Sequence, residues 1–553
     1  MLSSIECKGF RSLEDVTVPF EGMTALVGPN GAGKTAVLRA IDIMLGQTWP
    51  TLRSVRIPQD FTRFDPSHGL SIATSFDPPL IATDAMNTDR PITSLRLTCA
   101  PYKISGRHGD AGDLHVTLDP LSADGTIPMA AVTRPRQGAR PEFRPLNVST
   151  GLREQARVLF IDHRRSLAQH LPSTRGSILG RLFEPARKRY AADESAKKNF
   201  KQQYEAAMAL LKTSEVLEIE QTIHDTTIRM LGFLGSTAVG AIDIRFGLAD
   251  PANPFNSFRI EYFEQGLQIP GEELGLGVQS AVVIGIFEAL RKIGGEVGTV
   301  VIEEPEMYLH PQAQRYFYRL LRDLADKQEC QIIYSTHSPI FADITRFEGL
   351  RVCRKPIGQM TSVSYVSQDQ DAEYLASQRA AQRLEIGFDP ASSELLFAKK
   401  ALLVEGPGDK LATLRTATNL HLDIDGEGLS VVPCGGKNAI PFYVRACRAF
   451  DIPYVVMYDR DVFPIPSDAD TGTIAKISAE NEQAERETQV IVDAVEDPEL
   501  LFVLDPSLEE VLGIGRTAKD KPRRVVAALD EIDVTSYPTV LKEAVNALFT
   551  LRS

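Results

Sequence analysis

The feature that most restricts the fold is a Gly-rich run of eight residues, Gly28 to Thr35 (GPNGAGKT). The run matches the pattern GxxxxGK[ST], and it lies in the required context, after a predicted strand (residues 23–27) and before a predicted helix (36–45). Glycines let backbone N–H groups turn inward around phosphate oxygens, and the helix N-terminus attracts negative charge. The sequence therefore predicts an α/β fold whose phosphate-binding loop holds ATP through Asn30, Gly31, Gly33, Lys34 and Thr35.

Two adjacent glutamates follow another apolar strand much later in the chain. Residues 300–302 (VVI) lead directly into Glu303 and Glu304. A carboxylate at the carboxyl end of a parallel strand lies beside the phosphate loop, where it orients Mg²⁺, and a neighbouring carboxylate polarises the attacking water. We assign the metal-orienting role to Glu303, although aspartate is commoner there, and the general-base role to Glu304.

Two further segments occur in the order found in ABC-type ATPases. Residues 274–280 (LGLGVQS) open a predicted helix and resemble the signature motif, although Ser280 follows a glutamine here, so only the Gly-rich turn is carried over. His337 follows the strand predicted at 331–335 and resembles the switch histidine that senses the γ-phosphate. The order resembles the DNA-repair branch of this family, the RecF and SMC relatives, and implies a dimer that encloses two ATP molecules.

A second set of carboxylates marks the C-terminal third. The apolar strand 401–404 ends in Glu405, and the strand 454–458 ends in Asp459, Arg460 and Asp461. Because the carboxyl ends of parallel strands lie side by side, these carboxylates would repel one another unless divalent cations neutralised them. Oxygen ligands suit Mg²⁺ or Mn²⁺ better than zinc, and such a site can hold a scissile phosphate and activate a water.

Composition removes several other classes of protein. The net charge of −13 excludes a globally basic nucleic-acid binder, although it does not exclude a local basic groove. No apolar run reaches the length of about 18 residues that a membrane-spanning helix needs, and the first residues do not resemble a signal peptide. The six scattered cysteines favour neither a disulfide framework nor a zinc site, and they fit a reducing cytoplasm.

The Glu405 and Asp459-x-Asp461 pattern resembles a Toprim domain, and an ABC-type ATPase followed by Toprim resembles the OLD (overcoming lysogenization defect) nucleases, which include the nuclease subunit of Gabija anti-phage systems. The resemblance implies metal ligands at Glu405, Asp409, Asp459 and Asp461, with a further ligand from Glu510 or its neighbour Glu509. It also implies that Lys521 stabilises the pentavalent phosphate, and it leaves a phosphate contact of Lys437 open.

The same resemblance gives an expected organisation. The ATPase would comprise residues 1–162 and 237–365, interrupted by a helical dimerisation region at 163–236, and a linker at 366–395 would lead to the Toprim domain at 396–553. The expected partners are DNA, a second or further copy of the chain and, in some relatives, a UvrD-like helicase. No membrane association is expected.

Two hypotheses about function remain. In the first, the protein is an ATP-binding and ATP-hydrolysing, divalent-metal-dependent DNA endonuclease, with a role in anti-phage defence that rests on the resemblance alone. In the second, it is an ATP-driven DNA clamp or repair ATPase, similar to RecF and SMC, whose Toprim domain does not catalyse. All four acidic positions of the Toprim pattern are present, which favours the first hypothesis.

Overall fold

The structure is a computed structural model, and it describes most of the chain. The residues that it does not describe are 47, 103–111, 133–141, 157, 163–202, 204–205, 207–212, 234–240, 247–257, 265–266, 271–273, 294–297, 329, 368–369, 383–389, 468, 516–520 and 552–553. Among the described residues, no helix is both long and apolar enough to cross a membrane.

The described chain packs as two compact units. One unit contains Met1–Thr24 and Thr35–Thr336, and the other contains Ala25–Lys34 and His337–Ser553. This division does not test the domain limits that the sequence predicts, which stay predictions.

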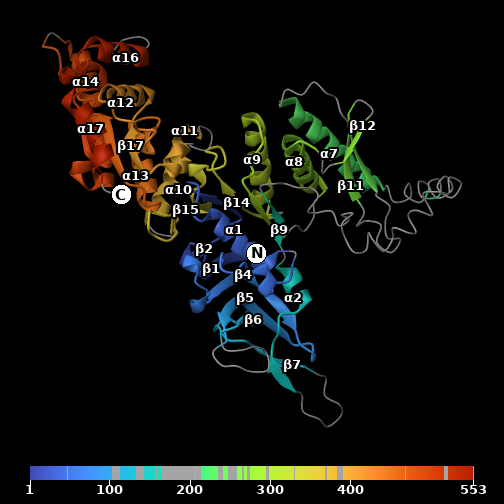
Figure 1. The fold of residues 1–553 in the computed structure, drawn as a ribbon. Coiled ribbons are helices and arrows are strands. Elements are labelled where there is room, and N and C mark those ends of the chain that lie inside the picture. The colour runs from blue at the N-terminus through green and yellow to red at the C-terminus, as the bar shows by residue number, and fades with distance from the viewer. Residues whose placement is uncertain are drawn as a thin grey trace. The chain divides into compact units, whose positions relative to one another are not determined.

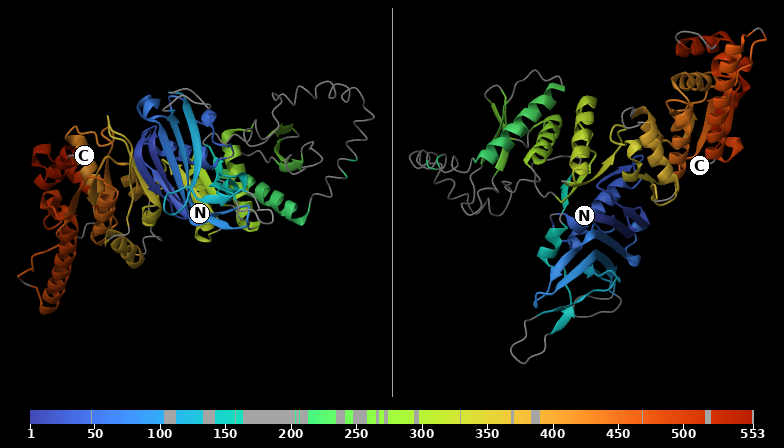
Figure 2. Two further views of the ribbon diagram at one scale, coloured as in Figure 1. Left: turned by 90° about the horizontal axis from the view of Figure 1, so that it is seen from below. Right: turned by 180° about the vertical axis from the view of Figure 1, so that it is seen from behind.

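The first unit begins with a five-stranded antiparallel sheet in the order β2-β1-β4-β5-β6 (Figures 1 and 2). Its strands are β1 (Leu2–Phe10), β2 (Leu13–Pro19), β4 (Leu70–Thr83), β5 (Asp89–Pro101) and β6 (Leu114–Leu121). Along β1 Ile5 and Cys7 are buried and Lys8 is exposed, as expected for a sheet with one face on a core.

Three parallel strands of the same unit carry the double glutamate. β13 (Thr299–Glu303) pairs with β9 (Val158–Ile161) on one side and with β14 (Gln331–Thr336) on the other. Every residue of β13 and β14 is buried, which explains why the centres of both strands, residues 300–302 and 332–334, are apolar without alternation. Helix α9 (Pro311–Asp326) begins between them, with His310 as its N-cap.

The helical region predicted at 163–236 is described only in part. Its last segment forms α7 (Ser214–Phe233), which packs on α8 (Leu276–Ile293). A Cβ atom at Gly285 of α8 would lie 3.0 Å from the Ile223 carbonyl oxygen, so the absent side chain lets the two helices approach closely. Most of residues 163–212 lie outside the described chain, and the dimerisation role of this region stays a prediction.

The second unit contains the phosphate-loop strand and the C-terminal sheet. β3 (Met23–Val27) pairs in parallel with β15 (Leu350–Arg354), which pairs with β16 (Ser362–Ser364). Helices α10 (Gln370–Gln382) and α11 (Pro390–Ser393) lie in the segment predicted to be a linker, residues 366–395.

The C-terminal sheet is parallel, with four strands in the order β18-β17-β19-β20. They are β17 (Lys400–Val404), β18 (Leu429–Pro433), β19 (Tyr454–Asp459) and β20 (Leu501–Leu504). Buried residues of α12 (Pro407–Asn419), α16 (Lys521–Glu531) and α17 (Thr539–Thr550) form one core with this sheet. Helix α13 (Ile440–Ala449) packs on β17 and on α14 (Thr471–Val495), which extends beyond the sheet in Figure 2.

Candidate functional site

The carboxyl ends of β17 and β19 bring the two predicted acidic segments together. These strands are neighbours in register, with Val404 opposite Met457, so Glu405 and Asp459 leave the sheet at the same edge. The Asp459 backbone N–H donates a 2.8 Å hydrogen bond to Glu405 Oε1. The two segments, more than 50 residues apart in the sequence, are thus in direct contact, as the sequence analysis requires.

The remaining two carboxylates are placed by local backbone geometry. Asp409 lies in the first turn of α12, where its Oδ2 accepts a 2.9 Å hydrogen bond from the N–H of Gly406 and caps the helix. Asp461 has a left-handed backbone with φ of 60°, an unusual conformation for a residue that is not glycine. Its N–H donates to the Pro506 carbonyl at 2.8 Å, which ties the acidic turn to the segment after β20.

Lys437, in the turn after β18, binds the acidic turn. Its ammonium donates to the carbonyls of Asp459 and Arg460 at 2.6 and 3.0 Å and lies 3.6 Å from Asp461 Oδ2. The side chain is only 5 % exposed, and the Gly435 and Gly436 N–H groups that precede it donate to the Glu405 carbonyl. Lys437 therefore positions the acidic turn, a role that the sequence left open.

Burial and mutual repulsion raise the pKa values of three of the four carboxyl groups. Burial, followed by the charges of Asp409 and Glu405, raises the pKa of Asp459 to about 9. The pKa of Glu405 rises to about 7, mainly through burial and then through Asp409 and Asp461. Burial and the Glu509 charge raise the pKa of Asp409 to about 6. A cluster of carboxyl groups whose pKa values are raised by burial and by one another's charge is typical of a functional site.

Of the two candidates for a further acidic ligand, Glu509 is the one whose charge acts on Asp409. Both glutamates belong to the short helix α15 (Leu508–Val511), and the role of Glu510 stays a prediction. The backbone of this helix also holds the acidic turn, because the Leu508 N–H donates to Asp459 Oδ1 at 2.9 Å, and no residue type in the sequence marks this contact. Lys521 is the first residue of α16, and its side chain lies outside the described part of the structure.

The donor set suits a hard divalent cation, because it offers carboxylate oxygens and no sulfur or imidazole. As the side chains stand, no three acidic, His or Cys residues of the described chain converge closely enough to hold one ion. Oxygens of Glu405, Asp409 and Asp459 instead accept hydrogen bonds from backbone N–H groups. Ion binding would therefore need at least one of these carboxylates to change its rotamer.

The raised pKa of Asp459 gives a prediction for stability. Its folded-state pKa of about 9 exceeds the usual 3.8, so ionisation opposes folding, and this cost grows as the pH rises from about 4 to 9. Asparagine keeps an acceptor for the Leu508 N–H and carries no charge. We expect Asp459→Asn to raise the melting temperature in EDTA by about 2–6 °C at pH 8.5 and by less at pH 5. The measurement is circular dichroism at the two pH values.

The exposed Asp425 is the matched control for this substitution, because it lies in the same unit. Asp425→Asn should change the melting temperature little at either pH. If Asp459→Asn had the same effect at pH 5 and pH 8.5, ionisation of Asp459 would not oppose folding.

The phosphate-binding loop needs glycine for steric reasons at two positions. A Cβ atom at Gly28 would lie 2.2 Å from the Cys353 carbonyl oxygen of β15, and one at Gly33 would lie 2.4 Å from Thr361 Oγ1. Both glycines have positive φ. Lys34, the first residue of α1 (Lys34–Leu45), folds across the loop and donates to the carbonyls of Gly28 and Pro29 at 2.7 and 2.9 Å.

The double glutamate is held at the end of β13. Glu303 is buried, and Glu304 adopts a left-handed backbone with φ of 48°. The Glu304 N–H donates to the Ser335 carbonyl of β14 at 3.0 Å. Such a backbone conformation costs energy and is often found at functional sites. The segment after Glu304 is also held by β14, because Thr336 Oγ1 donates a 2.8 Å hydrogen bond to Glu306 Oε1.

The signature-like turn, residues 274–280, lies near the segment that follows β13. Ser280, buried in α8, donates from Oγ to the Met307 carbonyl at 3.3 Å, and the Gln279 amide donates to the Leu274 carbonyl. His337 follows β14 and is half-buried. The structure therefore explains how Glu304 and Ser280 are positioned, while the catalytic roles of Glu303, Glu304 and His337 stay predictions.

Comparison with known proteins covers both parts of the chain. The family described as "AAA ATPase domain" matches residues 1–100 and 150–342, and the "Overcoming lysogenization defect protein-like, TOPRIM domain" matches residues 396–461. The first match covers the phosphate loop and the double glutamate, and the second covers the four carboxylates from Glu405 to Asp461. A P-loop ATPase domain followed by a Toprim domain is thereby confirmed.

Three relatives have nuclease names. The "OLD nuclease" of Thermus scotoductus is 52% identical over 548 residues, which are 99% of this chain and 98% of the relative. The "Endonuclease GajA" of Bacillus cereus is 30% identical over 98 residues, 15% of this chain and 14% of that protein. The "Old nuclease" of Escherichia phage P2 is 26% identical over 198 residues, 34% and 33% of the two chains. The chain belongs to the OLD family, whose members join an ATPase domain to a Toprim nuclease domain, and it is an enzyme of that kind.

Proposed function

We propose that the protein is a divalent-metal-dependent DNA endonuclease whose ATPase domain controls access of DNA to the Toprim site. The observation that carries the proposal is the contact between Glu405 and the Asp459 backbone, with Lys437 fixing the acidic turn. Within the described chain this cluster combines several carboxylates with raised pKa values at one sheet edge. The names of the three relatives support cleavage of a nucleic acid.

In this proposal Mg²⁺ or Mn²⁺ is bound by Glu405, Asp409, Asp459 and Asp461, with Glu509 or Glu510 as a further ligand. The bound ions would activate a water and neutralise the scissile phosphate. The chain's own residues supply the geometry, since Lys437 and the Leu508 N–H orient the Asp459 segment. Lys521 is proposed to stabilise the charge on the phosphate during cleavage.

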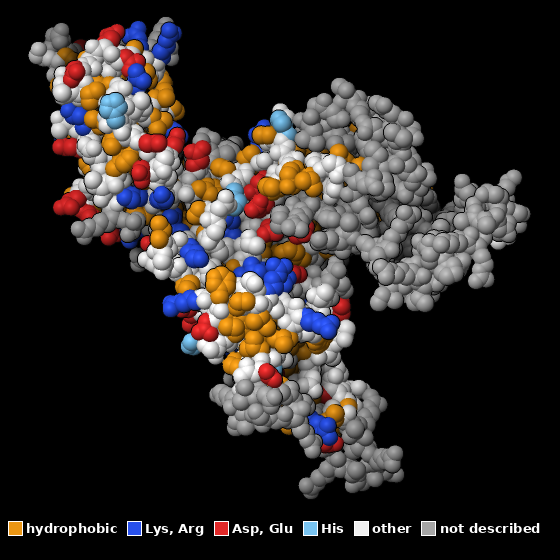
Figure 3. All heavy atoms as spheres, viewed as in Figure 1, with side chains coloured by type: hydrophobic (Ala, Val, Ile, Leu, Met, Phe, Trp, Pro, Cys, Tyr) orange, Lys and Arg blue, Asp and Glu red, His pale blue; other side chains and the backbone are white. Residues whose placement is uncertain are grey.

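In the ATPase domain, Asn30, Gly31, Gly33, Lys34 and Thr35 are proposed to bind ATP with Mg²⁺. Glu303 would orient the metal, Glu304 would act as general base and His337 would sense the γ-phosphate. The predicted homodimer or higher oligomer would form around ATP. On the face drawn in Figure 3, acidic and basic side chains are interspersed over the C-terminal part, so the described residues of this face do not form one broad basic surface.

A role in anti-phage defence is also part of the proposal, and it is supported by the match to GajA. A helicase partner similar to UvrD stays a prediction from the resemblance. A cytoplasmic location agrees with the six cysteines, all of which are buried and free. The alternative function, an ATP-driven DNA clamp with a Toprim domain that does not catalyse, predicts the same binding of DNA without cleavage.

Removal of divalent metal distinguishes the two functions. We expect the purified protein to cleave supercoiled plasmid in Mn²⁺ or Mg²⁺ and to lose this activity in excess EDTA, with recovery when Mn²⁺ is restored. Because the carboxyl groups must lose protons to bind metal, cleavage should also rise between pH 6 and pH 9. Conversion to nicked and linear plasmid is read on agarose gels. Cleavage that persists in EDTA, or a protein that binds plasmid without cutting it in Mn²⁺, would contradict the proposal.

A further inference from the structure

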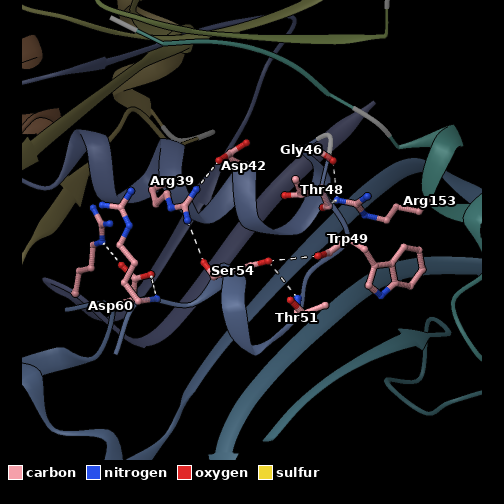
Figure 4. Close-up of polar contacts among 11 residues, drawn as sticks. Arg39, Asp42, Gly46, Thr48, Trp49, Thr51, Ser54, Asp60 and Arg153 are labelled. Atoms are coloured by element: carbon pink, nitrogen blue, oxygen red, sulfur yellow. Dashed lines mark hydrogen bonds and ion pairs between the residues drawn. The ribbon is translucent and has the colours of Figure 1, made fainter. Parts of the chain in front are cut away.

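The first unit contains a cavity that the ATPase and nuclease roles do not use. It has a volume of about 360 Å³ and lies beside the C-terminal half of α1 and the loop that follows (Figure 4). The residues that line it are Arg39, Asp42, Ile43, Thr48, Trp49, Thr51, Arg53 and Ser54. Its size is within the range of small-ligand sites.

A buried arginine from a distant helix fixes one wall of this cavity. Arg153, in α2 (Thr150–Gln155), is 7 % exposed and donates to the carbonyls of Met44, Gly46 and Thr48 at 3.2, 2.7 and 2.7 Å. Its guanidinium also lies 5.5 Å from the centre of the Trp49 ring. The loop that carries Trp49 is therefore held in place by Arg153, a residue about 105 positions further along the chain.

The opposite wall is fixed by Arg39 and Ser54. Arg39 donates from Nη1 to Asp42 Oδ2 at 2.6 Å and from Nη2 to the Ser54 carbonyl at 3.0 Å. Ser54 Oγ accepts from the Thr51 N–H and donates to the Trp49 carbonyl. The Arg39 Nε atom is buried and has no hydrogen-bond partner in the described chain, so this wall keeps one unused donor.

The chemistry of the lining indicates the ligand. Trp49 remains 42 % exposed despite its contact with Arg153, so part of its ring is accessible. Arg53 is exposed, and Thr48, Thr51 and Ser54 add hydroxyl groups that can both donate and accept hydrogen bonds. An aromatic ring next to cations and hydroxyl groups is typical of sites that stack a nucleobase and hold its phosphate.

We propose that this cavity binds one unpaired nucleotide, with its base against Trp49 and its phosphate near Arg53. Two sources share this chemistry: a nucleotide in a single-stranded stretch of DNA and a free mononucleotide. The first source rests on the proposed action on DNA. None of the Toprim carboxylates lines the cavity, so the role proposed for it is binding of the ligand.

The test uses the fluorescence of Trp49, which is the only tryptophan in the chain. The full-length Lys34→Ala protein in EDTA is titrated with a ten-residue oligo-dT, with a 20-base-pair duplex and with dTMP, so that neither cleavage nor the phosphate loop contributes. We expect quenching by oligo-dT at concentrations at least about 5-fold lower than for the duplex. Saturable quenching by oligo-dT alone indicates strand binding, and equal quenching by dTMP indicates a free nucleotide.

Variants supply the control. Binding of labelled oligo-dT, followed by anisotropy, should weaken about 5-fold or more in Trp49→Ala and in Arg53→Ala. The exposed aromatic residue Phe64 is in the same unit, and Phe64→Ala should bind like the unaltered protein. Arg53→Ala retains Trp49, so its folding is checked by the fluorescence spectrum. No quenching by any probe, tighter binding of the duplex, or equal effects of Trp49→Ala and Phe64→Ala would overturn the proposal.

The proposed cleavage function and this site can fail independently. Glu405→Ala should abolish cutting while leaving the Trp49 quenching unchanged. If the protein does not cut DNA and quenching persists, only the endonuclease proposal fails. If it cuts DNA and quenching is absent, only the nucleotide site fails.

Discussion

Replacement of Glu405 by alanine is expected to lower DNA cleavage at least about 100-fold. The substitution removes a proposed metal ligand and the acceptor of the 2.8 Å hydrogen bond from the Asp459 N–H, so it affects both acidic segments. The loss should appear mainly in the rate of cutting at saturating DNA. The measurement is single-turnover conversion of supercoiled plasmid in Mn²⁺ at pH 8.

The matched control is Glu427→Ala, because Glu427 is an exposed glutamate of the same unit, away from the carboxyl ends of the strands. This variant should cut at the rate of the unaltered protein. Both variants should bind plasmid equally in EDTA. Unchanged cleavage by Glu405→Ala would place the nuclease site elsewhere in the chain.

Replacement of Lys34 by alanine is expected to lower ATP hydrolysis about 100-fold or more. Lys34 is 4 % exposed and its ammonium lies over the loop, 2.7 Å from the Gly28 carbonyl, where it can turn towards bound phosphates. Alanine removes this charge without adding volume. Release of inorganic phosphate from ATP in Mg²⁺ measures the effect.

A matched control for Lys34→Ala is Lys8→Ala, because Lys8 is an exposed lysine of β1 in the first unit. Its ATPase rate should be unchanged. Plasmid cleavage by Lys34→Ala, with and without ATP, then shows whether the nucleotide promotes or restrains cutting. ATP hydrolysis at the original rate in Lys34→Ala would contradict the assignment of the phosphate loop.

The motifs that local sequence fixes were predictable. The phosphate loop, the strand before Glu405 and the strand before Asp459 each combine an apolar run with a turn whose residue types are chemically restricted. Parallel pairing then determines that Glu405 and Asp459 meet, because both follow the carboxyl ends of neighbouring strands.

Contacts made by the backbone or by distant residues were not predictable. The sequence could not show that the Leu508 N–H binds Asp459, because a backbone donor leaves no residue-specific signal. It also could not separate Glu509 from Glu510, which are adjacent in one short helix and point in different directions. The cavity near Trp49 depends on Arg153, and no periodic pattern joins these two positions.

The close packing at Gly28 has a consequence for communication along the chain. Its α-carbon lies so near the Cys353 carbonyl that no side chain fits between the phosphate loop and β15. A loop that moves towards β15 must therefore displace that strand, and β15 is followed along the chain by β16 and α10, which precede the Toprim sheet. The absence of a Cβ atom at Gly28 thus allows direct contact between the phosphate loop and the strand from which the chain continues to the Toprim sheet.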